Sequence, residues 1–153
     1  MSYQNILVPV DGSVISFSAV KKAAEIAQAF GGQLTLISLV AEDPLANSDF
    51  YYPSPIMKDY FAQAYANAEK ALQHAQALAR EQGIIANTRI IKGSVSEHGI
   101  VKTAEELKTD LIVMGSNGRK GFQKLLLGSF AQDVLKFIEL SENNDSKCVV
   151  FCI

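Results

Sequence analysis

Short apolar runs alternate with longer segments of helical periodicity along this chain, and this alternation restricts the fold more than any other feature. The apolar runs cover residues 5–10, 34–40, 87–91, 110–114 and 148–153. Between them, apolar residues recur at helical spacing over residues 16–30, about 57–82, 96–107 and 129 to about 140. The runs are continuously apolar, which is typical of parallel strands buried on both faces. The pattern predicts one α/β domain over residues 1–153, with a parallel sheet between helices.

The position of a ligand site follows from this fold class. In parallel sheets, ligands bind at the carboxyl ends of the strands, where the strand order reverses. Three loops follow apolar runs and carry polar or flexible residues, namely VDGS at 10–13, VAEDP at 40–44 and GSNGRKGFQKLLLGS at 115–129. These loops are the candidates for a functional site.

The longest of these loops has glycines at spacings that suit phosphate binding. Gly128 and Ser129 open a predicted helix, whose free amides and positive dipole end attract anions. Gly115 and Gly118 would let the backbone approach a ligand closely, and Arg119 adds positive charge. The spacing fits neither the P-loop nor the dinucleotide fingerprint. The alternative is that the glycines serve only the turn and that Ser129 is only a helix N-cap.

The other two loops allow a functional and a structural interpretation each. Asp11 at a strand end can accept hydrogen bonds from a ribose or a base, or approach a metal ion beside a phosphate. Aspartate is also common as a turn former or helix cap. The backbone of Val40 can read the edge of an adenine, or Val40 can simply end its strand. Both functional interpretations gain support if the loops meet at one switch point.

Three stretches together resemble a known family. ILVPVDGS, DLIVMGSNGRKG and LLLGSFAQDVL are similar to the nucleotide-binding kind of universal stress protein, and Gly115, Gly118, Gly128 and Ser129 meet its G-x2-G-x9-G-[ST] pattern in full. The resemblance implies a Rossmann-like fold akin to adenine nucleotide alpha hydrolases, with a five-stranded parallel sheet of order 3-2-1-4-5 and two helices on each face. It also implies that the chain binds ATP, ADP or AMP, with or without Mg²⁺ or Mn²⁺.

The same resemblance implies a role for each site residue. Asp11 would lie near the ribose and phosphates, and Val40 would contact adenine through its backbone. The residues that line the pocket beside the nucleoside would be Pro9, Val10, Met114 and Gly115. The residues that flank or hold the ribose and phosphates would be Ser13, Ser116, Gly118, Arg119, Gly128, Ser129 and the amide of Phe130. Homodimers would form through the last strand, Cys148 to Ile153.

Composition and motifs also exclude several classes. The net charge is −2, without the clustered basic surface of a nucleic-acid-binding protein. The sequence has no apolar run that approaches the roughly 18 residues of a membrane span and no signal peptide, so we expect a cytoplasmic protein. The two histidines and two cysteines lack ligand spacing, so no direct metal motif is predicted; Asp11 would meet a metal only together with ATP.

The predicted function is an ATP-binding, stress-response module without an identifiable catalytic residue. The alternatives are a slow ATPase and a dimeric scaffold that binds no nucleotide. An aromatic set, Phe50, Tyr51, Tyr52, Tyr60 and Phe61, allows three interpretations: packing of the loop against the second helix, a lid over the nucleotide, or a dimer contact.

Overall fold

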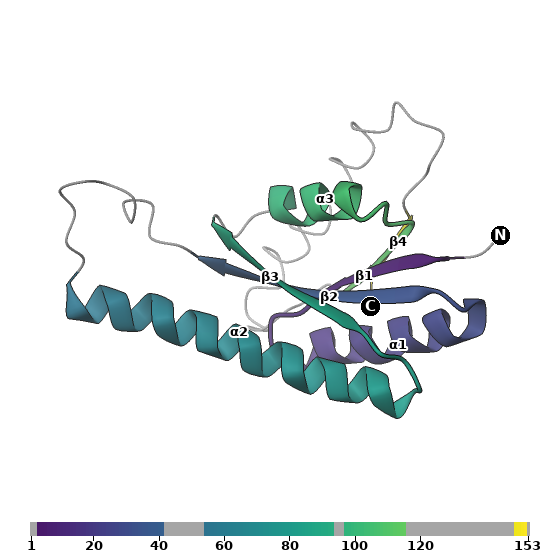
Figure 1. The fold of residues 1–153 in the computed structure, drawn as a ribbon, viewed down its shortest axis with the longest axis horizontal. Coiled ribbons are helices and arrows are strands. Elements are labelled where there is room, and N and C mark those ends of the chain that lie inside the picture. The colour runs from purple at the N-terminus through teal and green to yellow at the C-terminus, as the bar shows by residue number, and fades with distance from the viewer. Residues whose placement is uncertain (1–2, 42–53, 94–96, 116–148, 153) are drawn as a thin grey trace.

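The computed structural model describes residues 3–41, 54–93, 97–115 and 149–152 (Figure 1). Along the chain these residues form β1 (Asn5–Pro9), α1 (Val14–Phe30), β2 (Gln33–Ala41), α2 (Pro55–Glu81), β3 (Asn87–Gly93), α3 (Glu97–Glu106), β4 (Leu111–Met114) and β5 (Val149–Cys152). The predicted α/β class with a parallel sheet is confirmed. The helix predicted from Ser129 to about Leu140 lies outside the described residues.

The strands pair in parallel in the order β3-β2-β1-β4-β5. β1 is central, with Pro9 opposite Ile37 of β2 and Leu7 opposite Ile112 of β4. From β1 the chain moves outward to β2 and β3 and then crosses back to β4 on the other side. The strand order therefore reverses between β1 and β4, which makes the carboxyl ends of these two strands the switch point.

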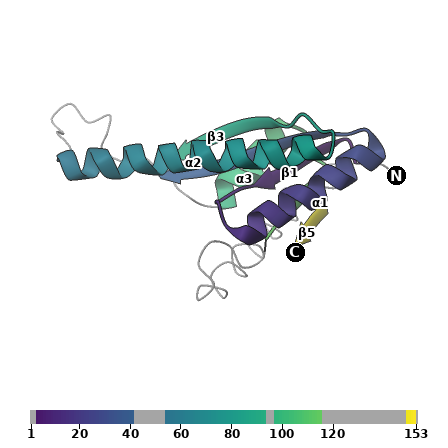
Figure 2. The same ribbon diagram turned by 90° about the horizontal axis from the view of Figure 1, so that it is seen from below.

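The helices lie on opposite faces of this sheet. α1 and α2 cover one face and α3 covers the other (Figures 1 and 2). Alternate residues of each strand supply the two cores because successive side chains point to opposite faces. Ile6 and Val8 of β1 belong to the core under α1 and α2, whereas Leu7 belongs to the core under α3. The prediction of two helices on each face is met on the α1 and α2 side; on the other face the described part of the chain contains only α3.

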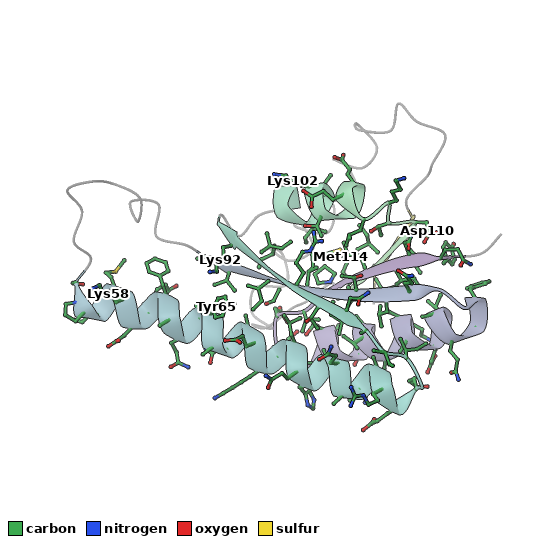
Figure 3. The ribbon with its side chains drawn as sticks, viewed as in Figure 1. Lys58, Tyr65, Lys92, Lys102, Asp110 and Met114 are labelled. Carbon is green, nitrogen blue, oxygen red and sulfur yellow. The ribbon has the colours of Figure 1, made fainter. Side chains whose placement is uncertain are left out.

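Asp110 ties the amino ends of β1 and β4 together (labelled in Figure 3). Its two carboxylate oxygens accept hydrogen bonds from the backbone N–H groups of Gln4, at 2.9 Å, and Asn5, at 3.0 Å. Its own N–H donates to the carbonyl of Asn5 at 2.9 Å. Charge-assisted bonds of this kind are stronger than neutral ones, so Asp110 holds the two strands together at their amino ends, opposite the switch point.

The turn from α1 into β2 uses two consecutive glycines for different reasons. Gly31 ends the helix in the left-handed region, with φ 67°, and both Gly31 and Gly32 donate their N–H to the carbonyl of Ala27. Gly32 instead lies against the start of β1, where a Cβ would stand 2.5 Å from the carbonyl oxygen of Tyr3. The first glycine is required by conformation and the second by space.

α2 extends well past the sheet at its amino-terminal end (Figures 1 and 2). It begins at Pro55, two residues earlier than predicted, because the Ser54 hydroxyl accepts the N–H of Met57 at 3.2 Å and proline suits the first turn. Its buried residues begin only at Ala68. Tyr60, which is 61% exposed, packs edge-on against Phe61 at 5.2 Å.

Phe50, Tyr51 and Tyr52 of the predicted aromatic set lie outside the described residues. The length of α2 does not make it a membrane segment. Among the helices of the described residues, none combines the length and apolar character that crossing a bilayer requires.

Candidate functional site

The turn between β1 and α1 is fixed by its own side chains. Oδ1 of Asp11 accepts the N–H of Ser13 at 2.9 Å, and Gly12 adopts φ 82°, which few other residues tolerate. The hydroxyl of Ser13 accepts the N–H of Ser16 at 3.1 Å and so caps α1. Asp11 therefore forms the turn that was its structural alternative, and Ser13 caps the helix.

The first turn of α1 is closed further by Ser16, whose hydroxyl donates to the carbonyl of Ser13 at 2.8 Å. Ser13 and Ser16 are buried, whereas Val14 between them is 84% exposed. The capping bonds thus hold the helix start in one conformation, and the half-buried Asp11 stands directly before it at the carboxyl end of β1.

The end of β4 adjoins this turn. The pairing of β1 with β4 runs through Ile6 with Leu111 and Leu7 with Ile112, so Pro9 and Met114 each stand two residues beyond the last pair. Val10 and Gly115 are the next residues along each strand, at the carboxyl ends of two adjacent strands. Val10 and Met114 are buried, and Met114 belongs to the core under α3 (labelled in Figure 3). The structure therefore brings together four of the predicted pocket residues.

Gly115 also contacts α1, which the sequence did not indicate. A Cβ on Gly115 would stand 2.8 Å from Cγ2 of Ile15 and 3.1 Å from its Cγ1. Those distances are shorter than real Cβ contacts, so only glycine fits at position 115 without a shift of its surroundings. The side chain of Ile15 thus occupies the space where a side chain of residue 115 would lie. Sequence reasoning missed Ile15 because this contact joins residues far apart in the chain.

The end of β2 offers its backbone through Leu39 more than through Val40. The N–H of Val10 donates to the carbonyl of Ile37 at 2.7 Å, so the polar groups of Ile37 point toward β1. Backbone groups alternate sides along a strand, so those of Leu39 also point to the β1 side, where β1 has already turned into α1. Those of Val40, opposite Lys92 in the register, point toward β3.

This difference depends on register, which the sequence alone does not give. A slip of one residue exchanges the two sides of a strand. The side chain of Val40 is buried, so its contribution to the edge of the site is limited to packing.

A positive charge lies at the same end of the sheet, near the carboxyl end of β3. Nζ of Lys92, on β3, lies 4.9 Å from the ring centroid of Tyr65 on α2 (Figure 3). This distance is within the range of a cation–π interaction. Lys92 is therefore directed toward α2, two strands away from the switch point.

The remaining predicted site residues lie outside the described residues. They are Ser116, Gly118, Arg119, Gly128, Ser129 and Phe130. Gly115, the last described residue of this region, leads directly into them. In the part of the chain that the structure describes, no group of three or more His, Cys, Asp or Glu side chains is arranged to hold a metal ion.

The reversal of strand order beside two adjoining loops places the chain among the doubly wound α/β proteins. The sequence profile of the Universal stress protein family matches residues 2–139. Universal stress protein MJ0531 of Methanocaldococcus jannaschii is 34% identical over 138 residues, which cover 88% of this chain and 76% of the relative. The chain therefore belongs to the universal stress protein family.

Solved structures agree with this assignment. UspA from Lactobacillus plantarum superposes with a TM-score of 0.76 at 26% identity, covering 100% of this chain and 99% of that one. A universal stress protein crystallised in complex with cAMP superposes with a TM-score of 0.70 at 27% identity, covering 100% of this chain and 98% of that one.

Proposed function

We propose that this universal stress protein binds an adenine nucleotide, with ATP as the main ligand, at the switch point between β1 and β4. One observation carries the proposal. Gly115, the first glycine of the G-x2-G-x9-G-S sequence, lies against Ile15 in the first turn of α1, which follows the Asp11 turn directly. The first glycine of a pattern suited to phosphate and a strand-end carboxylate therefore lie at the carboxyl ends of β4 and β1, where doubly wound proteins bind ligands. The similar structure that was crystallised with cAMP supports an adenine nucleotide.

The described residues fit the nucleoside end of such a ligand. Val10 and Met114 are apolar and buried beside the switch point, and the Asp11 carboxylate stands at its rim. The backbone of Leu39, in preference to that of Val40, would offer a donor and an acceptor to the edge of the base. These groups can bind and orient a nucleoside.

The phosphate end is assigned by sequence to residues outside the described part of the chain. Gly128, Ser129 and the amide of Phe130 would hold phosphates at a helix start, because free amides there favour anions. Ser116, Gly118 and Arg119 would flank the ribose and phosphates. Mg²⁺ or Mn²⁺ would arrive with the phosphates, and Asp11 would be the carboxylate beside them; a bound cation would supply charge neutralisation.

A purified sample tests the proposal directly. Mass spectrometry of the small molecules released on denaturation is expected to detect an adenine nucleotide. ATP at about 100 times its Kd should add about 2.7 kcal/mol of stability. In a chain of this size that corresponds to a rise in Tm of about 5–10 °C. If the sample releases no nucleotide and its Tm is unchanged by ATP, ADP or AMP, the protein is instead the scaffold that binds no nucleotide.

The alternative of a slow ATPase is tested by incubating the protein with ATP and Mg²⁺ or Mn²⁺ and measuring whether the ATP stays intact.

We further propose that two copies pair through β5. The sheet has two edges, and β3 contains Arg89 and Lys92, whereas Val149–Cys152 of β5 contains no charged residue. Charged residues on an edge strand discourage pairing with another sheet, so β5 is the edge that favours it. In such a dimer the unpaired edge of β5 in each copy would be covered by β5 of the other copy.

The cytoplasmic location stays a prediction.

Sedimentation equilibrium is expected to give twice the chain mass of 16.6 kDa. Hydrogen exchange followed at two protein concentrations locates the interface. The amides of residues 149–152 should exchange faster after dilution below the dissociation constant, while those of β3 should not change. A monomer at all concentrations, or a dimer whose β5 amides are insensitive to dilution, would contradict this pairing.

A further inference from the structure

The contact between Ile15 and Gly115 joins the two loops of the switch point. Ile15 is the second residue of α1, two residues after the N-cap Ser13. Gly115 is the first residue after β4. The contact therefore connects the start of the first helix with the start of the glycine-rich loop, across the position where the strand order reverses.

The helix side of this contact is held firmly. Asp11 accepts the N–H of Ser13, the Ser13 hydroxyl accepts the N–H of Ser16, and the Ser16 hydroxyl returns a bond to the Ser13 carbonyl. Isoleucine in a helix has essentially one χ1 rotamer, so its Cγ atoms have a fixed position relative to the backbone. The Asp11 carboxylate and the Ile15 side chain are thus parts of one rigid turn.

The strand side rests directly on that turn. A Cβ at position 115 would stand 2.8 Å from Cγ2, 3.1 Å from Cγ1 and 3.4 Å from Cβ of Ile15. The first two distances are below ordinary contact, so the backbone of Gly115 lies closer to Ile15 than a residue with a side chain could lie without a shift. The separation between the Asp11 turn and the beginning of the β4 loop is therefore set by the size of residue 15.

We propose that Ile15 is a positioning residue of the nucleotide site, which sets the separation between the Asp11 turn and Gly115 at the end of β4 without touching the ligand. The inference rests on the nucleotide binding proposed above. A ligand that spans both loops binds best at one separation, and a displacement of about 1 Å can change the energetics of a site substantially. The specific prediction is that ATP affinity depends jointly on residues 15 and 115.

Four variants separate this role from a general effect on stability. Ile15→Val keeps Cβ, Cγ1 and Cγ2, the three atoms that meet Gly115, and is the matched control. Ile15→Ala removes both Cγ atoms, and Gly115→Ala introduces the clash. In the double variant Ile15→Ala/Gly115→Ala the nearest remaining atom is Cβ at 3.4 Å, an ordinary contact.

The Kd for ATP is measured by calorimetry for each protein at a temperature where all are folded, together with its unfolding midpoint. Ile15→Val should bind within about twofold of the unsubstituted protein, and Gly115→Ala should bind about tenfold or more weakly, as expected for directly contacting residues. The double variant should recover to within about threefold of Ile15→Ala, because coupled neighbours are not additive.

The outcomes distinguish the two proposals. If the unsubstituted protein binds no adenine nucleotide, the proposed function is wrong and the positioning role falls with it. If it binds ATP but Gly115→Ala binds equally well, or the double variant binds no better than Gly115→Ala, the positioning role alone is wrong. A lower unfolding midpoint with an unchanged Kd would leave the contact a purely structural one and would also overturn the proposal.

Discussion

Replacing Gly118 and Ser129 together with alanine is expected to weaken ATP binding by about 30- to 100-fold. A Cβ on Gly118 would keep the backbone from approaching the ligand, and loss of the Ser129 hydroxyl removes a donor at the helix start that would face the phosphates. Each loss is worth about 1 kcal/mol or somewhat more, which together gives this range. Isothermal titration of ATP against the purified variant measures the effect.

A matched pair of substitutions on α1 controls for this experiment. Ser18→Ala and Gly31→Ala remove one serine hydroxyl and one glycine, on the exposed side of the helix and at its end far from the switch point. That variant should keep the ATP affinity of the unsubstituted protein. Adenosine, which lacks phosphates, should bind a single Ser129→Ala variant without loss. An unchanged ATP Kd in the Gly118 and Ser129 variant would show that these residues do not form the site.

The second large effect concerns stability. Gly32→Ala is expected to lower the free energy of unfolding by about 3 kcal/mol, at the upper end of the usual cost of overpacking. The new Cβ would stand 2.5 Å from the Tyr3 carbonyl oxygen and 3.1 Å from that of Gln4. Neither backbone atom can move away easily, because the Gln4 carbonyl accepts the N–H of Gln33 at 2.7 Å and the Gln4 N–H donates to Asp110.

The neighbouring glycine provides the comparison. A Cβ on Gly31 would meet nothing within 4 Å, so Gly31→Ala should cost only about 1 kcal/mol, from its φ of 67°. Urea unfolding of both variants gives the two differences. In a chain of this length the larger one corresponds to a Tm about 6–12 °C lower. If Gly31→Ala were the more damaging of the two, the steric account of Gly32 would be wrong.

Much of the fold follows from local patterns in the sequence. Continuous apolar runs identified the strands because a parallel sheet buries both faces of each strand, as Leu7 and Val8 on opposite faces illustrate. Helical spacing likewise identified the inward side of α3, where Ile100 and Ala104 are buried. The Asp11 turn was recognisable because its chemistry is local: aspartate accepts a backbone bond two residues on.

The parts that sequence reasoning missed depend on contacts between distant segments. Which of Leu39 and Val40 turns its backbone toward the switch point is decided by the register of β2 against β1. Gly115 looked like a glycine reserved for a ligand, but its empty side is filled by Ile15, one hundred residues earlier in the chain. Periodicity describes one element at a time and carries no information on such pairings.

The two ends of the sheet carry separate tasks. Asp110 and Gly32 act at the amino end of β1, whereas Asp11 and Gly115 act at its carboxyl end, about 13 Å away along the strand. Proteins in which one region serves both stability and activity often lose one when the other is improved. We therefore expect substitutions at the amino end to change thermal stability without changing the affinity for the proposed ligand. Stability and ligand affinity could then be changed by substitutions at opposite ends of the same strands.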